Sequence, residues 1–398
     1  MLTPYRAQSA AEMAGAGDSA LNWYSRRLAG AIESAGVHVS IVSPIADREE
    51  GSPWSDAGGM TVHPSFRRGA ASAVFQAYRQ IVKLPSAVVH VQHELFAFGG
   101  LTSALLLPSM LRLITLRGKK VLITIHGVIP LAKVTDEFVR ANRIPGNAFA
   151  ARALWRWLIR GVANASSRVH VHEPFLRTLL VEEYGIGEDR IEVIPLGIEP
   201  AAPGVSRNEA REKYGIPPEA EVALFFGYLA AYKGIEYLLS EMQQLLASRP
   251  DLHLIIAGAV PARLEGTIDP QLAVRQLTNG AERVHLLGFV PDEEAVTVFA
   301  ATDVVLLPYR VAMSSSGPLA LAIGYNVPVL LSDAFRDAFP DAPGYFALNT
   351  GGLTRAVVDF MTDRSARSGH VAFIDKLRNL RNWPRVAREM IATYERLK

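Results

Sequence analysis

The sequence predicts an α/β protein made of two doubly wound, Rossmann-like domains that face each other across a cleft. Short runs of Val, Ile and Leu recur along the chain, and helical patterns separate them. Continuous apolar runs of this kind are typical of parallel strands whose sheet is covered by helices on both faces. The runs form two series with a Pro- and Ala-rich stretch between them, so we expect two domains.

The first series of expected strands comprises residues 37–42, 88–92, 121–125, 168–171 and 191–194. A doubly wound domain normally begins with a central strand, but here only residues 1–5 precede a polar stretch, so we expect a first strand that is short or missing. The second series comprises residues 222–226, 253–257, 284–287, 304–307 and 327–331. These series predict an N-terminal domain over residues 1–198, a linker over 199–220 and a C-terminal domain over 221–375.

Composition excludes several classes of protein. The chain has 398 residues, with 41 Lys and Arg against 39 Asp and Glu, and this balance argues against a nucleic-acid partner. It has no cysteine, which excludes disulfides, thiolate zinc sites, iron–sulfur clusters and a cysteine nucleophile. Glycines, Pro108 and Arg112 interrupt the longest apolar run, and the first residues lack the apolar core of a secretory signal. We therefore expect a cytoplasmic protein.

A candidate anion site lies in the run ALFFGYLAAYKGIEYLL. An expected strand ends at Phe226, a turn follows at Gly227, and Lys233 with Gly234 precedes a helix. Free amides and the helix dipole at such a helix start attract anions, and a lysine ammonium can reach the same place. The simpler alternative is a surface lysine that precedes an ordinary helix start.

A second candidate segment follows the expected strand 304–307. Arg310 precedes the run Ser314 to Ser316, and then Gly317 and Pro318 begin an apolar helix. Hydroxyls and free amides beside an arginine are suited to a diphosphate, because charge-assisted hydrogen bonds to phosphate are strong. We predict that Arg310, Ser315, Ser316 and Gly317 contact such a diphosphate, and the alternative is a serine-rich loop with an ordinary helix cap.

In the N-terminal half, a glycine loop that contains Gly15 and Gly17 precedes a helix, and His126 lies at the end of an expected strand. Both positions are expected to face the cleft, although a lone histidine is often structural. His170 and His172 share one face of a strand and imitate metal ligands. No third ligand is evident, so no metal site is predicted.

Basic residues cluster near apolar ones in the N-terminal half. They are Arg112, Arg117, Lys119 and Lys120 in one segment, and Arg152, Arg156 and Arg160 in another. Such a stripe suits adsorption to an anionic membrane surface. A solvated helix face explains the same pattern, and both interpretations stay open.

An ordered series of segments resembles the group 1 glycosyltransferases of family 4, which have the GT-B fold. The segments are IEVIPLGI, FFGYLAAYKGIEYLL, LIIAG, VHLLGFVPDEE and ATDVVLLPYR, and the resemblance covers nearly the whole chain. The run from Asn382 to Ala387 is similar to the start of the family's final helix. By this resemblance, residues 376–398 form a helix that crosses back onto the N-terminal domain.

The resemblance implies a retaining, metal-independent glycosyltransferase without a cofactor. It would move a sugar from a nucleotide diphosphate sugar to a glycan or lipid-linked acceptor. By position, Lys233 would neutralise the departing diphosphate, Ser316 and Gly317 would supply amides, and His126 would face the donor sugar. Gly15 and Gly17 would let the backbone approach the reacting centre, and Arg310 would take over from an arginine that the family carries elsewhere. Charge that builds on the leaving oxygen makes such preorganised cations the largest expected catalytic contribution.

Some positions depart from the family pattern. Tyr228, Ala230 and Ala231 occupy a stretch where the family commonly carries an arginine, and Met313 and Leu321 stand where it carries glutamates. The alternative hypothesis is therefore a catalytically silent GT-B subunit that binds a partner transferase or a glycan. A sugar-nucleotide epimerase of the same fold is a third hypothesis.

Overall fold

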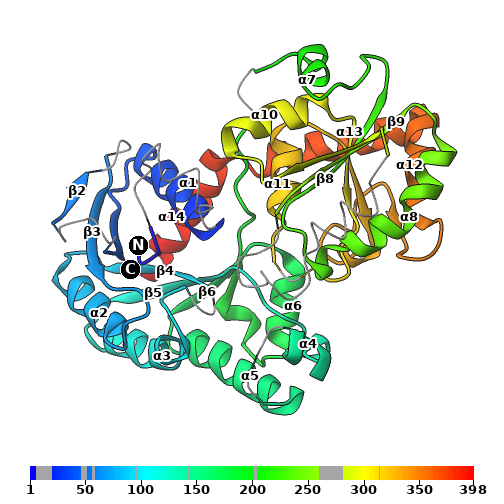
Figure 1. The fold of residues 1–398 in the computed structure, drawn as a ribbon. Helices are drawn as coiled ribbons and strands as arrows, with labels where there is room; N and C mark the ends of the chain where they lie inside the picture. The colour runs from blue at the N-terminus through cyan, green and yellow to red at the C-terminus, as the bar shows by residue number, and fades with distance from the viewer. Residues whose placement is uncertain are drawn as a thin grey trace. The chain divides into compact units, whose positions relative to one another are not determined.

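The computed structural model describes residues 1–5, 20–45, 52–55, 59–94, 97–141, 144, 146–200, 204–259, 281–312 and 314–398 (Figure 1). The chain folds as two compact units. The first comprises Met1–Gly197, Met313–Ser315 and Trp383–Lys398, and the second comprises Ile198–Ala312 and Ser316–Asn382. Each unit contains a largely parallel sheet with helices packed on it, so the predicted pair of Rossmann-like α/β domains is confirmed.

The sheet of the first unit has two blocks of strands. Their bounds are β1 (Ser40–Pro44), β2 (Trp54–Ser55), β3 (Thr61–Phe66), β4 (Val88–His93), β5 (Lys120–Ile125), β6 (Arg168–Val171) and β7 (Ile191–Val193). The order is β1-β3-β2 in one block and β4-β5-β6-β7 in the other, and within these blocks only the pair of β2 with β3 is antiparallel.

Leu2 joins the two blocks. It forms parallel bridges to Val42 of β1 and Val91 of β4. Its amide donates to the His90 carbonyl at 2.8 Å, and its carbonyl accepts from the Gln92 amide at 3.0 Å. The central strand, which was expected to be short or missing, is therefore present as a stub around Leu2.

Helices cover both faces of this sheet (Figure 1). On one face lie α1 (Ala20–Ser34) and α14 (Trp383–Leu397), and on the other lie α2 (Ala73–Lys83), α3 (Leu101–Leu116) and α5 (Ala148–Asn164). The shorter helices are α4 (Asp136–Ala141), α6 (Pro174–Glu182) and the 3₁₀ turns η1 (Leu131–Lys133) and η2 (Glu188–Arg190). The final helix that joins the first unit begins at Trp383, later than residue 376.

The second unit has one sheet, in which each strand pairs in parallel with its neighbours. Its strands are β8 (Glu221–Phe226), β9 (Leu252–Ala257), β10 (Val284–Gly288), β11 (Val304–Leu307), β12 (Val329–Ser332) and β13 (Tyr345–Phe346), in the order β10-β9-β8-β11-β12-β13. Its helical elements are η3 (Ala231–Lys233), α7 (Arg207–Lys213), α8 (Ile235–Ser248), α10 (Asp292–Ala301), α11 (Gly317–Gly324), η5 (Asp333–Phe335), α12 (Gly352–Thr362) and α13 (Arg364–Leu380). None of the helices that the structure describes is long and apolar enough to cross a membrane.

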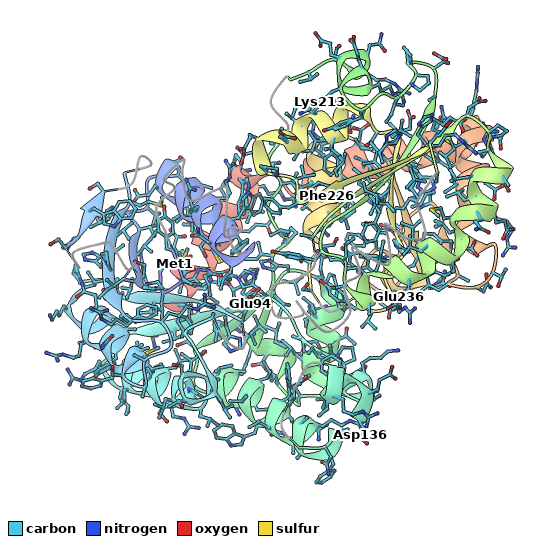
Figure 2. All side chains as sticks on the ribbon, viewed as in Figure 1. Met1, Glu94, Asp136, Lys213, Phe226 and Glu236 are labelled. Carbon is cyan, nitrogen blue, oxygen red and sulfur yellow. The ribbon has the colours of Figure 1, made fainter. Side chains whose placement is uncertain are left out.

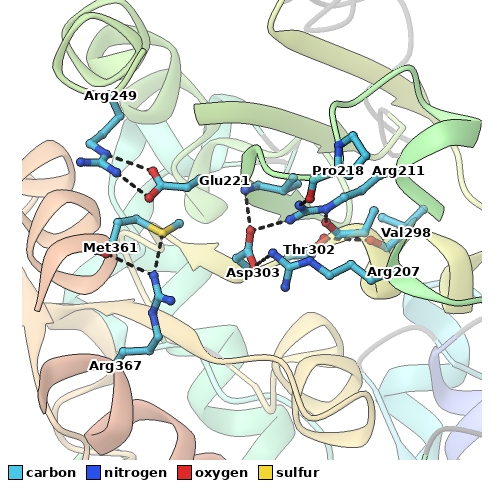
Figure 3. A network of polar contacts seen from close by, with 12 residues as sticks. Arg207, Arg211, Pro218, Glu221, Arg249, Val298, Thr302, Asp303, Met361 and Arg367 are labelled. Carbon is cyan, nitrogen blue, oxygen red and sulfur yellow. Dashed lines mark hydrogen bonds and ion pairs between the residues drawn. The ribbon is translucent and has the colours of Figure 1, made fainter. Parts of the chain in front are cut away.

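The stretch 199–220 is more structured than a linker, because it contains α7. Ser206 and Glu209 form a reciprocal capping box at the start of that helix. Arg211 is fully buried, donates to the Ala301 carbonyl and contacts the Asp303 carboxylate at 2.8 Å (Figure 3). Asp303 also accepts from the Val222 amide at the start of β8. This network fixes α7 at the amino ends of β8 and β11, away from the strand ends at which such sheets bind ligands.

Candidate functional site

In the second unit, the candidate site is built first from the turn after β8. Gly227 has φ +111°, a conformation that residues with a side chain rarely adopt. Its amide donates to the Ala257 carbonyl at the end of β9 at 2.8 Å. A Cβ on Gly258 would lie 1.9 Å from the Gly227 carbonyl oxygen. Two glycines therefore allow the backbones that leave β8 and β9 to pack directly on each other.

Lys233 is buried beside this turn. Its Nζ would lie 2.5 Å from a Cβ built on Gly227, and it is 5.7 Å from the centroid of the Tyr309 ring. Among the described residues, no hydrogen-bond acceptor or carboxylate is paired with this ammonium. Burial lowers the pKa of Lys233 to about 8. A buried cation without a partner is costly, and an anionic ligand would remove that cost.

The loops after β8 and β11 are locked together beside Lys233. Gly234 has φ +75°, and a Cβ there would lie 1.8 Å from the Pro308 carbonyl oxygen. The Arg310 amide donates to the Tyr232 carbonyl at 2.8 Å. Only glycine permits this approach, which joins the carboxyl ends of two neighbouring strands into one rigid edge.

The start of α11 completes this edge. Ser316 is the N-cap, and its hydroxyl accepts from the Leu319 amide at 3.2 Å and bonds the Tyr309 hydroxyl at 3.0 Å. A side chain on Gly317 would meet open space, whereas the ring of Pro318 lies 3.0 Å from the Cβ position of Gly227. Gly227, Lys233 and the amino end of α11 therefore lie together, and the helix dipole adds to the positive charge there.

Arg310 and Ser315 have partners of their own. Arg310 pairs with Glu236 at 3.0 Å, and the side chains are 49% and 61% exposed. Glu236 lies on the first turn of α8 and is labelled in Figure 2. The Ser315 hydroxyl donates to the Glu173 carboxylate at 3.2 Å, and the chain at Ser315 belongs to the first unit. The structure thus brings Lys233 and Ser316 together, and it leaves Arg310 in a separate, exposed ion pair.

In the first unit, His126 follows β5 and is partly buried. Its Nε2 lies 2.8 Å from Gln92 Oε1, its Nδ1 lies 3.2 Å from His172 Nε2, and its ring meets the edge of Tyr24 at a centroid distance of 4.7 Å. Burial lowers its pKa to about 3, so the ring is neutral. The predicted glycine loop with Gly15 and Gly17 lies outside the described residues.

His126 belongs to a closed ring of polar side chains that the sequence reasoning missed. The ring contains His90 and Gln92 of β4, Thr124 and His126 at the end of β5, His170 and His172 at the end of β6, and the Ile194 carbonyl. Each strand contributes residues at i and i+2, which share one face of the sheet. That spacing was visible in the sequence.

The Ile194 carbonyl fixes the tautomer of His170. His170 Nε2 lies 2.8 Å from this acceptor and therefore donates to it, and Thr124 then donates to His170 Nδ1. His172 Nδ1 lies 3.4 Å from the same carbonyl.

The ring is anchored from α14 and contains neutral histidines. The Tyr394 hydroxyl lies 2.7 Å from His90 Nδ1. Burial lowers the pKa of His170 to about 4 and that of His90 well below its usual value. Across the part of the chain that the structure describes, no group of three His, Asp or Glu side chains is arranged to hold a metal ion.

Two family profiles match the chain. Residues 21–202 match the profile described as Glycosyltransferase Family 4, and residues 220–363 match Glycosyl transferases group 1. A D-inositol 3-phosphate glycosyltransferase of Corynebacterium diphtheriae is 34% identical over 48% of this chain and 42% of its own. Another, of Pseudarthrobacter chlorophenolicus, is 25% identical over 91% of this chain and 81% of its own. A phosphatidyl-myo-inositol mannosyltransferase of Mycolicibacterium smegmatis is 26% identical over 53% of each chain.

Solved structures share the fold at low sequence identity. Sucrose-phosphate synthase from Thermosynechococcus elongatus matches with a TM-score of 0.72 and 18% identity over 94% of this chain and 93% of its own. Anabaena HepE in complex with UDP matches with a TM-score of 0.69 and 13% identity over 100% of this chain and 99% of its own. The matches span about half the length of several of the curated relatives, although the two profiles together account for most of this chain. The chain belongs to the family 4, group 1 glycosyltransferases, with the GT-B fold.

Proposed function

We propose that the protein transfers a hexosyl group from a nucleotide diphosphate sugar to a glycan or lipid-linked acceptor, with retention of the anomeric configuration and without a metal ion. The observation that carries this proposal is buried Lys233, whose ammonium has no hydrogen-bond or ion-pair partner among the described residues and lies beside Gly227 and the amino end of α11. These groups form one positive edge at the carboxyl ends of β8 and β11, where parallel sheets bind their ligands.

Lys233 would stabilise the leaving diphosphate. When the bond between sugar and phosphate breaks, negative charge builds on the leaving oxygen, and a cation already in place stabilises it without reorganisation. With a pKa of about 8, Lys233 is mostly protonated at pH 7, and an adjacent diphosphate would raise its pKa further. The free amides at the start of α11 would bind the same oxygens.

His126 would act by position rather than by proton transfer. Its pKa of about 3 makes it a poor base near neutral pH, and the ring of hydrogen bonds fixes its orientation. Because both of its ring nitrogens are already hydrogen-bonded, a neutral imidazole held in this way would orient the donor sugar through van der Waals contact. We assign Gly15 and Gly17 to close backbone approach in the same reaction.

The relatives support a hexose donor, and their names add inositol derivatives, including the lipid phosphatidyl-myo-inositol, to the acceptors that a test should include. Several curated relatives are D-inositol 3-phosphate glycosyltransferases, and Anabaena HepE was solved with UDP-glucose. UDP, GDP and ADP sugars all offer the diphosphate that Lys233 would bind. A direct screen of nucleotide sugars is therefore needed to identify the nucleotide base and the sugar of the donor.

The direct test incubates the protein with UDP-glucose, GDP-mannose or ADP-glucose and with D-inositol 3-phosphate or phosphatidyl-myo-inositol in EDTA. We expect one pair to give a product whose anomeric configuration, measured by NMR coupling, equals that of the donor. Lys233→Met should reduce turnover by at least about a hundredfold, as does loss of one oxyanion-stabilising group elsewhere. An inverted product, or a requirement for added Mg²⁺ or Mn²⁺, would contradict this mechanism.

A silent subunit is the second candidate function, and Leu321 favours it. This apolar residue lies on α11, where the family carries a glutamate by alignment of the sequence. A silent subunit would bind no nucleotide sugar and would co-purify with a partner transferase. Nucleotide binding therefore separates the two functions.

A further inference from the structure

Tyr309 is held in place from several sides in the second unit. It lies two residues after β11 and is 5% exposed. Its carbonyl accepts from the Ser332 hydroxyl at the end of β12 at 2.6 Å. Its ring packs on Phe335 at a centroid distance of 5.0 Å and lies nearly perpendicular to the ring of Tyr232 at 6.0 Å. Because a closely packed ring keeps one position, the groups that Tyr309 contacts are held by it.

The first of these groups is the Lys233 ammonium. Its Nζ lies 5.7 Å from the centroid of the Tyr309 ring, within the range of a cation–π interaction, and both side chains are buried. Among the described residues, no carboxylate is paired with this ammonium, and the charged residues of the adjoining turns, Arg310 and Glu236, pair with each other. Burial lowers the pKa of Lys233. The aromatic ring therefore offsets part of the cost of a buried cation before an anion binds.

The second group is the Ser316 hydroxyl at the start of α11. It lies 3.0 Å from the Tyr309 hydroxyl and accepts from the Leu319 amide at 3.2 Å. Burial raises the pKa of Tyr309, so its phenol keeps its proton and is able to donate. A serine hydroxyl has one hydrogen and two lone pairs. When the phenol donates, both lone pairs of Ser316 are occupied, and the Ser316 hydrogen is left for a third partner.

We propose that Tyr309 is a positioning residue of the donor site: its ring holds the Lys233 ammonium, and its phenol directs the Ser316 hydrogen to a diphosphate oxygen. One fixed side chain then sets the distance between a cation that follows β8 and a donor at the start of α11. Groups that are arranged in advance need no reorganisation when charge develops on the leaving oxygen. The identity of the anion rests on the proposed function, whereas the contact of the ring with Lys233 does not.

The ring is tested first, without a ligand. The pKa of Lys233 is measured in the whole protein from the carbon NMR signal of its Cε, which is assigned by its loss in Lys233→Met. Tyr309→Phe keeps the ring and should leave this pKa at about 8. Tyr309→Leu removes the ring and should lower the proton affinity of the amine by about tenfold. An unchanged or higher pKa in Tyr309→Leu would overturn the role of the ring, because the ring would then only shield the amine from water.

The phenol is tested by calorimetric titration of the whole protein with UDP, GDP and ADP. Tyr309→Phe should weaken the binding of the preferred nucleotide by about fivefold, as expected for the loss of one hydrogen bond. In a Ser316→Ala background the same change should have no effect, because the phenol acts only through the Ser316 hydroxyl. Equal losses in both backgrounds, or no loss in either, would overturn the role of the phenol.

Tyr345 provides matched controls in the same unit. Its ring lies 4.5 Å from the Arg336 guanidinium, and its hydroxyl donates to the Phe339 carbonyl, so Tyr345→Phe and Tyr345→Leu remove the same kinds of interaction. Both variants should keep the wild-type pKa of Lys233 and the wild-type affinity. If Tyr309→Leu does not fold, Tyr309→Met takes its place, because a flexible methionine fills irregular space.

The outcomes separate this role from the proposed function. A folded wild-type protein that binds none of the three nucleotides would contradict the donor site and, with it, the role of the phenol. The NMR titration would still decide whether the Tyr309 ring holds the Lys233 ammonium. A wild-type protein that binds one nucleotide, with Tyr309→Phe binding it equally well, would leave the proposed function intact and overturn the role of the phenol.

Discussion

The ammonium of Lys233 occupies the space that a side chain on Gly227 would need, because its Nζ lies 2.5 Å from the Cβ position of that glycine. The positive φ of Gly227 adds backbone strain of about 1–3 kcal/mol to any substitution. Gly227→Ala should therefore displace Lys233 and weaken nucleotide binding by at least about tenfold, as measured by calorimetry. Gly344→Ala, whose Cβ meets open space, is the matched control and should bind normally. Equal affinities in both variants would show that Lys233 does not contact the nucleotide.

Burial of Lys233 predicts a stability change with pH. Its folded pKa of about 8 lies below the unfolded value of 10.5, so the unfolded chain retains a proton that the folded chain releases between these values. The free energy of unfolding of the wild type should rise with pH across this window. Lys233→Met removes a burial cost of about 3 kcal/mol at pH 7 and should flatten this rise. Urea unfolding from pH 7 to 10.5 measures both effects, with exposed Lys376→Met as control.

The ion pair of Arg310 with Glu236 predicts that substitutions of these two residues change the affinity for nucleotide but not the stability of the fold. Both side chains are about half exposed, and such pairs contribute about 0–1 kcal/mol to folding. Arg310→Ala should therefore leave the midpoint temperature of thermal unfolding nearly unchanged. It should weaken nucleotide binding, because we expect the guanidinium to turn from Glu236 to the diphosphate. Glu236→Gln releases the arginine and should strengthen binding. If neither change alters the affinity, Arg310 has no role in the donor site.

The neutral histidines predict sensitivity to acid. The folded pKa of His170 is about 4, whereas an unfolded histidine has a pKa of 6.5, so the unfolded chain binds the extra proton as pH falls below 6.5. Protonation of this one histidine in the unfolded chain should lower the free energy of unfolding by about 2 kcal/mol between pH 7 and pH 5. His170→Gln should reduce the slope of unfolding free energy against pH, while exposed His38→Gln should not. Parallel slopes in all three proteins would mean that His170 is not held neutral.

Much of the fold could be predicted because buried parallel strands are continuous apolar runs. The expected strand 121–125 corresponds to β5, which begins one residue earlier, at Lys120. The expected strand 304–307 has the same bounds as β11. β2 and β13 each contain only two residues, too few to form a pattern. β3 alternates buried and partly buried residues and contains Pro64, so its sequence does not resemble the buried runs.

The candidate site could be predicted in part. The sequence indicated Gly227, Lys233 and Gly234 because free amides at a helix start and a nearby lysine ammonium can bind an anion together. The partner of Arg310 could not be found in the same way, because Glu236 meets it only after two strands have come together. The histidine ring also depends on the register of three adjacent strands, which a single sequence does not specify.

The most direct test of the central claim is a calorimetric titration of the protein with UDP, GDP and ADP in EDTA, repeated with Lys233→Met. We predict micromolar binding of one nucleotide, which weakens as pH rises through about 8 in the wild type and is largely lost in the variant at every pH. Binding to none of the three by a folded protein, or equal binding by the variant, would contradict a donor site built on Lys233.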